Sequence, residues 1–199
     1  MKLILSTRNK GKVKEFRSLL SELPLEIITL EEFSSPPSAI EDQPDFCGNA
    51  VKKAEMLRDY CHGLVLADDS GLEVDILGGY PGVYSARFAG EGASDEDNNR
   101  KLLYLLQGIP LPKRRARFRC AIAIAYPGLE TSVVEGECEG YIGFEPRGES
   151  GFGYDPLFVY APKGMTFAEL GEDFKNKISH RAQALRRVKT KLREILQLI

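Results

Sequence analysis

The stretch LVLADDSGLEV, residues 64–74, places a short apolar run directly before two carboxylates. Such a run is typical of a buried strand, and we expect this strand to end at Asp68 and Asp69. Ser70 and Gly71 then predict a tight turn. On an extended backbone neighbouring side chains point to opposite faces, so we expect one carboxylate to face a ligand and the other to brace the chain. Open α/β sheets bind ligands at the carboxyl ends of their strands, which makes this junction a candidate site.

Upstream of this stretch, strands and helices alternate. Residues 2–6 (KLILS) predict a first buried strand and residues 25–30 a second. Between them we expect a helix, with Asn9 as its N-cap and Pro24 after its end. Its buried face is predicted from apolar residues at helical spacing, namely Val13, Phe16, Leu20 and Leu23.

The rest of the chain adds further helices and a group of strands. Residues 31–45 predict a long polar loop that contains prolines, and residues 46–60 a helix. Ser94 is the expected N-cap of the next helix. Residues 114–144 predict two or three antiparallel strands, and residues 176–199 a final helix. This order indicates an α/β fold with a mixed sheet and flanking helices.

Bulk composition narrows the class of protein. The chain has 199 residues, 43% hydrophobic and 28% charged, with a formal net charge of -2, which fits a single domain over residues 1–199. This balance favours neither nucleic acid nor an anionic membrane as a partner. No apolar run approaches the ~20 residues of a membrane span, and the run at Leu3 to Leu5 is too short for a signal peptide. We therefore expect a cytoplasmic protein, whose four cysteines are reduced core residues rather than zinc ligands.

The first candidate binding segment is STRNKGK, residues 6–12. A strand ends there and a helix begins, so its N–H groups and its lysines suit phosphate oxygens. It is neither a Walker A loop nor a GxGxxG loop. The alternative is an ordinary capped surface helix with solvated lysines.

Carboxylates in two places predict a metal site. Asp69 at the strand end and Glu41 in the proline-containing loop offer the hard oxygen ligands that Mg²⁺ prefers, with waters and substrate phosphates completing the shell. Two structural alternatives remain open. Asp69 also fits an Asx-type turn, and Glu41, with the neighbouring Asp42 and Asp45, also fits a solvated acidic loop.

Two later segments offer groups for a nucleotide base. In GESGFGYDPLF, residues 148–158, glycines surround Phe152 and Tyr154, and an exposed aromatic ring there is able to stack on a base. A hairpin turn with core aromatics is the alternative. In FKNKISHRAQAL, residues 174–185, His180 and Arg181 are expected opposite the apolar face of the last helix, either as donors to a purine or as plain surface residues.

Taken together, these motifs resemble one family. STRNKGK with Glu15, ADDSGLEVDILGGYPGVYSARFAG, ARFRCAIA, GFGYDPLF and KNKISHRAQAL occur in this order over nearly the whole chain. The chain resembles the inosine triphosphate pyrophosphatase family, also called Ham1-like or RdgB-like dITP/XTP pyrophosphatases. The resemblance implies an elongated mixed sheet with two lobes around a central cleft, and a homodimer. It also implies Mg²⁺-dependent hydrolysis of ITP, dITP and XTP to the monophosphate and pyrophosphate. One departure is Gly48, where family members often carry Glu.

The resemblance also implies roles for individual residues. Asp69 is the implied catalytic proton acceptor and, with Glu41, a metal ligand. The implied substrate-binding residues fall into three groups along the chain, which are Thr7, Arg8, Asn9, Lys10, Gly11, Lys12 and Ser70 near the phosphates, Phe152, Gly153, Tyr154 and Asp155 around the base, and Lys175, His180 and Arg181 at the base edge.

We expect water to attack the α-phosphorus, with pyrophosphate leaving. An ordinary Asp has a pKa of about 3.9 and is a weak base at neutral pH. We therefore expect a metal to lower the pKa of the water, and Asp69 to orient that water and accept its proton. Two alternatives are a Maf-like pyrophosphatase with pyrimidine substrates, which the SHR and GFGYDP motifs disfavour, and a nucleotide-binding regulator without catalysis, which Asp69 and Lys12 disfavour.

Overall fold

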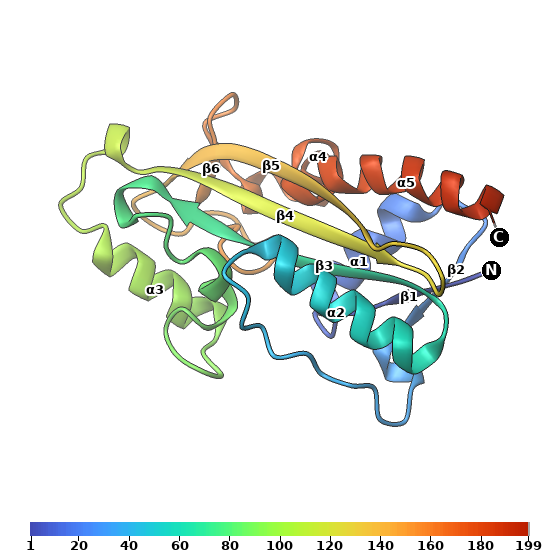
Figure 1. Ribbon diagram of the computed structural model, residues 1–199. Coiled ribbons are helices and arrows are strands. Elements are labelled where there is room, and N and C mark those ends of the chain that lie inside the picture. The colour runs from blue at the N-terminus through green and yellow to red at the C-terminus, as the bar shows by residue number, and fades with distance from the viewer. Residues whose placement is uncertain (199) are drawn as a thin grey trace. The chain divides into compact units, whose positions relative to one another are not determined.

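The computed structural model describes residues 1–198 and contains one seven-stranded sheet in the order β2-β1-β3-β4-β5-β6-β7 (Figure 1). Its strands are β1 (Lys2–Leu5), β2 (Glu26–Thr29), β3 (Leu64–Val74), β4 (Arg115–Ala125), β5 (Ser132–Ile142), β6 (Phe158–Tyr160) and β7 (Met165–Thr166). β1 pairs in parallel with β2 and β3, whereas β6 pairs antiparallel with β5 and β7. The predicted mixed α/β sheet is therefore confirmed.

The helices are α1 (Lys10–Leu20), α2 (Phe46–Cys61), α3 (Asp95–Leu105), α4 (Phe167–Ile178) and α5 (His180–Leu198). None of those helices, as far as residue 198, is both long enough and apolar enough to cross a bilayer. The chain divides into two compact units. Unit 1 comprises residues 1–69, 120–136 and 181–199, and unit 2 comprises residues 70–119 and 137–180. The strands β3, β4 and β5 each contribute residues to both units.

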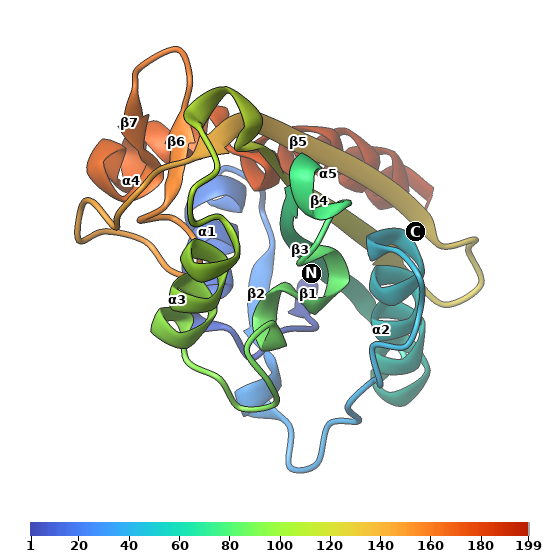
Figure 2. The same cartoon turned by 90° about the vertical axis from the view of Figure 1, so that its left-hand side faces the viewer.

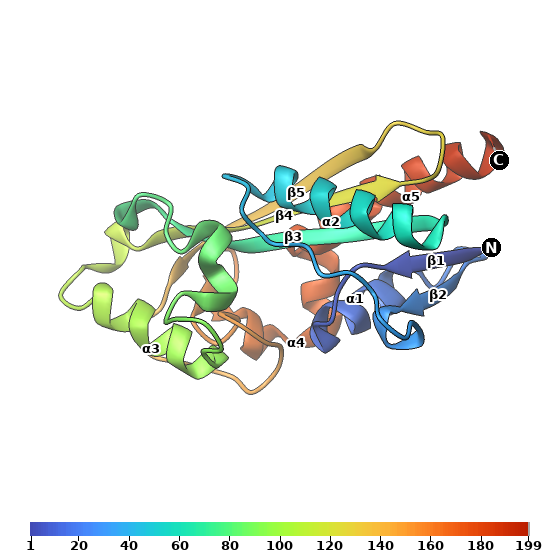
Figure 3. The ribbon, with the colours of Figure 1, turned by 60° about the horizontal axis from the view of Figure 1, so that its bottom comes forward.

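Unit 1 has its core against one face of β1 and the first half of β3. Leu3 and Leu5 of β1 alternate with Ile4, as Leu64 and Leu66 of β3 do with Val65, so each strand buries both faces. The face that carries Leu3, Leu5, Leu64 and Leu66 packs against α1 and α5. The residues that those helices bury in this core are Phe16, Leu20, Leu185, Val188, Leu192 and Ile195. In Figure 3, α2 lies on the other side of β1 and β3 from α1. This arrangement places helices on both sides of the strand that carries Asp68 and Asp69.

Unit 2 has a separate core that is rich in aromatic residues. Phe118, Phe158 and Phe167 pack together there, with ring centroids 4.6 to 5.7 Å apart. Figure 2 shows the hairpin of β6 and β7 beside α4. Two helices of this unit begin with a capping box, Ser94 with Asp97 for α3 and Thr166 with Glu169 for α4. The N-cap predicted at Ser94 is confirmed.

The predicted end of the third strand was wrong. β3 continues through Ser70 and Gly71 to Val74, so no tight turn follows Asp69. Leu72 and Val74 flank the half-buried Glu73 and are fully buried in the core of unit 2. This alternation keeps the backbone extended past the carboxylates, so Asp69 lies within a long strand rather than at its end.

The predicted final helix is also two helices. α4 ends at Ile178, Ser179 takes an extended conformation with ψ 160°, and α5 begins at His180. Ile178, which was expected on the face of the last helix, instead packs against the core of unit 2. Nearer the start of the chain, α1 ends at Leu20, so Leu23 lies beyond the helix whose face it was predicted to extend.

Candidate active site

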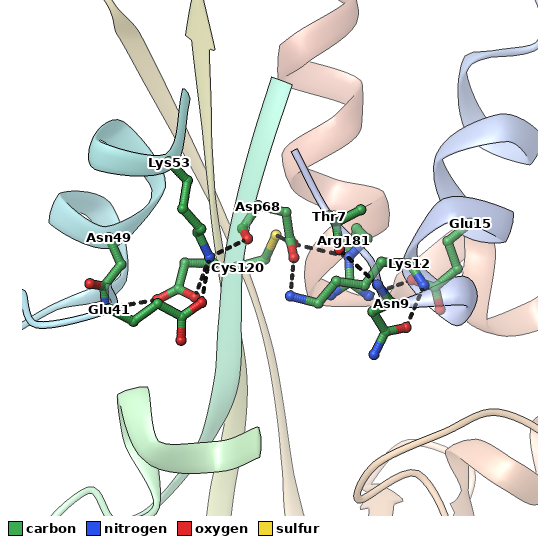
Figure 4. A network of polar contacts seen from close by, with 11 residues as sticks. Thr7, Asn9, Lys12, Glu15, Glu41, Asn49, Lys53, Asp68, Cys120 and Arg181 are labelled. Atoms are coloured by element: carbon green, nitrogen blue, oxygen red, sulfur yellow. Dashed lines mark hydrogen bonds and ion pairs between the residues drawn. The ribbon is translucent and has the colours of Figure 1, made fainter. Parts of the chain in front are cut away.

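Asp68 and Asp69 lie side by side on β3 and face opposite sides of it, as predicted from strand geometry. Asp69 is 6% exposed and contacts α2, where Lys53 Nζ lies 2.8 Å from Oδ1 and Asn49 Nδ2 donates to Oδ2 at 3.2 Å. Asp68 is 2% exposed and contacts helices on the other face. Figure 4 shows Asn49 and Lys53 on one side of β3, and Lys12 and Arg181 on the other.

On the α2 side, the ammonium of Lys53 joins two carboxylates. Besides Asp69, Lys53 Nζ donates to Glu41 Oε1 at 3.0 Å and to the main-chain oxygen of Asp68 at 2.8 Å. Glu41 belongs to the loop predicted over residues 31–45, and its ion pair with Lys53 holds it close to Asp69. The structure therefore brings together the two carboxylates that were predicted as metal ligands.

The surroundings of Asp69 change its acidity. Burial raises the pKa of Asp69, while Lys53 and Lys12 act in the opposite direction and Glu41 adds to the rise; the net result is a raised pKa. A carboxylate with a raised pKa holds a proton more readily than an ordinary Asp does. The charged form of Lys53 is also favoured, because Asp69 and Glu41 raise its pKa despite its burial.

On the other side of β3, Asp68 connects two helices. It forms ion pairs with Lys12 of α1 and with Arg181 of α5, whose Nε lies 3.1 Å from Oδ2, and it accepts a hydrogen bond from the Cys120 thiol at 3.0 Å. Burial alone would raise the pKa of Asp68, but Arg181 and Lys12 hold it well below its ordinary value. Arg181 also pairs with Glu15. Asp68 thus braces the two helices, and its lowered pKa favours the ionised form.

The segment from Thr7 to Lys12 forms the start of α1. Asn9 is the N-cap, and its Oδ1 accepts from Lys12 N at 3.0 Å, which confirms the predicted cap. Thr7 Oγ1 accepts from Asn9 N at 3.2 Å. Arg8 and Lys10 are exposed and Gly11 is half-buried, so this helix start presents cationic side chains.

In unit 2, Asp155 and Lys175 form a buried pair beside Phe152. Lys175 Nζ lies 2.5 Å from Asp155 Oδ2 and 4.5 Å from the centroid of the Phe152 ring. Phe152 N donates to the same carboxylate oxygen at 3.0 Å. Gly151 adopts φ +87°, and a Cβ there would lie 2.1 Å from that oxygen, so the loop needs glycine at this position. The predicted base-binding residues Phe152, Asp155 and Lys175 are therefore neighbours.

The loop that holds Phe152 is anchored to α3. Gly153 N donates to Asp95 Oδ2 at 2.6 Å, and its main-chain oxygen accepts from Asn99 Nδ2 at 2.9 Å. Tyr154 is 4% exposed, and its hydroxyl donates to the main-chain oxygen of Ser85 at 2.9 Å. The side chain of Tyr154 therefore belongs to the core of unit 2, in line with the alternative of core aromatics.

The expectation that His180 and Arg181 lie opposite the apolar face of the last helix was wrong, because both are buried. His180 stacks on Phe118 in unit 2, with centroids 4.7 Å apart. Arg181 pairs with Asp68 and Glu15 in unit 1. These adjacent residues differ in environment because α5 begins at their position, where the chain passes from one unit to the other. Ser70 is half-buried on β3 directly after Asp69.

Several residues of these networks were not predicted from the sequence. Asn49 and Lys53 are four positions apart and thus share one face of α2, a spacing that the sequence contains. Cys120 was treated only as a core residue. Asp95 and Asn99 show the same four-residue spacing on α3, but nothing in the sequence connects that helix to Gly153.

This chain is similar to known proteins over nearly its full length. A model of the Ham1 family matches residues 3–191. The dITP/XTP pyrophosphatase of Desulforamulus reducens is 53% identical over 187 residues, which covers 94% of this chain and 93% of the relative. That of Bacillus subtilis is 51% identical over 185 residues, 93% of each.

Solved structures of Ham1 proteins are also similar to this chain. The Ham1 protein of Staphylococcus aureus has a TM-score of 0.87 at 37% identity, and that of Coxiella burnetii 0.88 at 38%; each comparison covers 98% of this chain and 99% of the other. Both the sequence and the fold are thus shared over nearly the full length. The chain belongs to the Ham1 family.

Proposed function

We propose that this protein hydrolyses ITP, dITP and XTP to the nucleoside monophosphate and pyrophosphate, and so removes deaminated purines from the nucleotide pool. The dITP/XTP pyrophosphatases that are about half identical to it over nearly their full length support this activity. The observation that carries the proposal is Asp69, a buried carboxylate with a raised pKa beside Lys53 and Glu41. This combination provides a proton acceptor next to oxygen ligands and a cation.

The carboxylates of Asp69 and Glu41 fit a magnesium site. Both already contact one ammonium, so both reach a single cation. Among residues 1–198, no group of three or more acidic, His or Cys side chains forms a site that could hold a metal ion by itself. A metal shared with the substrate suits this donor set, because Mg²⁺ typically uses one or two carboxylates plus phosphates and water. When bound, Mg²⁺ would supply a Lewis acid for the phosphates and the attacking water.

The chain's own residues then have defined tasks in the proposed reaction. Asp69 orients the attacking water and accepts its proton, for which its raised pKa makes it better suited than an ordinary Asp. The exposed cations of residues 7–12 and the N-terminus of α1 bind the triphosphate. Lys12, held by Asp68, is fixed in place for the same task. Attack at the α-phosphorus releases pyrophosphate.

Unit 2 supplies the proposed base recognition. Phe152 offers a ring for stacking, and Lys175, with His180, offers donors to the 6-carbonyl that ITP and XTP carry and ATP lacks. A buried donor left without an acceptor costs about 1–3 kcal/mol, which disfavours ATP. Arg181 acts through Asp68 and Glu15 in this proposal, since the structure buries it between them.

A panel of ITP, dITP, XTP, GTP, ATP and dTTP, assayed for pyrophosphate with and without Mg²⁺, tests the proposal. Release of pyrophosphate from ITP, dITP and XTP, dependent on the metal, is the expected result. Orthophosphate as the sole primary product would contradict it. A preference for dTTP would favour the Maf-like alternative, and binding without turnover the regulator.

The assembly and location of the protein are also proposals. We propose a cytoplasmic homodimer that acts on free nucleotides, without nucleic acid or membrane partners. Sedimentation equilibrium measures the dimer directly, and a single species of monomer mass at micromolar concentration would contradict it.

A further inference from the structure

The ammonium of Lys53 is enclosed by oxygen atoms on the α2 face of β3. Its ammonium has three donors, and three oxygens accept from it at 2.8 to 3.0 Å, namely Asp69 Oδ1, the main-chain oxygen of Asp68 and Glu41 Oε1. The side chains of Lys53 and Asp69 are 12% and 8% exposed, and that of Glu41 is 30% exposed. These bonds use the full donor capacity of the ammonium.

We propose that Lys53 is a built-in counter-ion for the Glu41–Asp69 pair, and that a divalent cation binds to this pair in competition with the Lys53 ammonium. This inference rests on the proposed function, which assigns the two carboxylates to the metal. It assigns a role to Lys53, which contacts neither the metal nor the base in the proposed function. Lys53 sets how tightly the metal is held, and it is therefore a positioning residue.

Electrostatics supports this competition. Two carboxylates that share one site repel each other, and the repulsion is strong where burial excludes water. Asn49 also contacts Asp69, but it donates a neutral hydrogen bond and adds no positive charge. Lys53 supplies a positive charge in direct contact with both carboxylates and holds Glu41, in a long loop, beside Asp69. A divalent cation that binds both carboxylates must replace this stabilisation.

One consequence concerns the order of binding. Because the protein has to give up its own ion pairs, Mg²⁺ alone binds weakly. Magnesium that arrives with a triphosphate gains the phosphate oxygens as further ligands. Metal binding is thereby coupled to substrate binding, which limits occupation of the site by free metal ions.

The test compares two adjacent lysines of α2. Lys53→Met removes the ammonium and retains an apolar side chain of similar length. Lys52→Met is the matched control, because Lys52 also pairs with an acid of the same loop, Asp42, at 2.8 Å, but on the surface. Calorimetric titration of each purified protein with Mg²⁺, in the absence of nucleotide, gives the dissociation constant. Scanning calorimetry in EDTA and in Mg²⁺ gives the melting temperatures.

For Lys53→Met we expect Mg²⁺ binding about tenfold tighter than in the wild type, a lower melting temperature in EDTA, and a larger recovery of that temperature on adding Mg²⁺. Lys52→Met should match the wild type within about twofold in affinity. Unchanged or weaker Mg²⁺ binding by Lys53→Met would overturn the proposal.

A second measurement needs no destabilised variant. The side-chain ammonium of a lysine that forms three buried hydrogen bonds gives a slowly exchanging ¹H–¹⁵N signal, which Lys53→Arg assigns by its disappearance. We expect Mg²⁺ to shift or broaden this signal in the wild type, and an unperturbed signal at saturating Mg²⁺ would overturn the proposal. These readouts do not involve hydrolysis, so an enzyme that fails to cleave ITP but shows the competition disproves only the proposed function.

Discussion

The polar networks of the two units differ in kind. In unit 1, the carboxylates Asp68 and Asp69 are surrounded by cations from three helices, with Lys12, Lys53 and Arg181 nearest. In unit 2, the buried ion pair of Asp155 with Lys175 lies among aromatic rings. The first network suits a substrate part with many negative charges, and the second suits a flat, uncharged ring with one carbonyl to read.

This difference indicates that the two units have different roles in the proposed reaction. All residues proposed for the metal belong to unit 1, as do those proposed for the phosphates apart from Ser70, whereas Phe152, Asp155 and Lys175 belong to unit 2. Changes in unit 1 should therefore alter turnover or stability, and changes in unit 2 should alter the choice of base. Variants in each unit test this separation.

Asp69→Asn should have the largest effect. It removes the proton acceptor while preserving shape, and general-base catalysis contributes about 10²–10⁴-fold, so kcat for pyrophosphate release should fall by at least about 10²-fold. The ITP-to-ATP ratio of kcat/KM should change little. Steady-state kinetics, with circular dichroism to verify folding, measures both. Unchanged turnover would remove Asp69 from the chemistry.

Asp68→Asn is the neighbouring change on the opposite face, and its main effect should be on stability. It leaves Arg181 and Lys12 without the carboxylate that pairs with both, and breaking a buried ion pair typically costs about 3–5 kcal/mol of unfolding free energy. Urea denaturation of Asp68→Asn and Asp69→Asn measures the contrast. Equal stability of the two variants would contradict the separate roles of the two faces.

Lys175→Met should act on base choice. Loss of a donor to the 6-carbonyl should cost about 1–3 kcal/mol of transition-state binding. This loss should lower kcat/KM for ITP roughly 5- to 150-fold, with little change for ATP. The ratio of the kcat/KM values for the two substrates is the useful quantity, because any loss of folded protein from removing the ion pair with Asp155 cancels in it. Lys177→Met, on the exposed side of α4, is the control. A constant ITP-to-ATP ratio in Lys175→Met would argue against base reading by this residue.

The smallest expected effect is on pH dependence. Because burial raises the pKa of Asp69, its ionised form is lost at a higher pH than for an ordinary Asp, whose pKa is about 3.9. The acid limb of kcat/KM should therefore lie above that value. The raised pKa of Asp69 and the lowered pKa of Asp68 change the free energy of unfolding with pH in opposite directions. A raised folded pKa favours the folded state at low pH, and this contribution disappears as pH rises through the folded pKa, whereas the lowered pKa of Asp68 stabilises above about pH 4.

Asp69→Asn removes one of these two contributions. As pH rises from about 4 through the raised pKa of Asp69, the unfolding free energy of the variant should fall less, or rise more, than that of the wild type. Parallel stability curves would show that Asp69 has an ordinary pKa in the folded protein.

Much of unit 1 could be predicted from local sequence patterns. Strand geometry separated Asp68 from Asp69, and the cap at Asn9 fixed the start of α1. Apolar spacing also identified the buried face of α5, from Leu185 to Ile195. These features depend on neighbours within a few residues, which a single sequence displays directly.

Other features depend on contacts between distant parts of the chain. The continuation of β3 past Ser70 depends on a second core that buries Leu72. The burial of Arg181 depends on Glu15, 166 positions away. Lys53 has the helical spacing of a surface lysine, and only the position of α2 against β3 gives it three buried acceptors. Tertiary packing, rather than local pattern, determined each of these outcomes.

The central claim is that water, positioned by Asp69, attacks the α-phosphorus. A single turnover of ITP in H₂¹⁸O with Mg²⁺, followed by mass spectrometry of both products, tests it most directly. Attack at the α-phosphorus is expected to place one ¹⁸O atom in the phosphate of IMP and none in pyrophosphate. Label in pyrophosphate would mean attack at the β-phosphorus and would contradict the account.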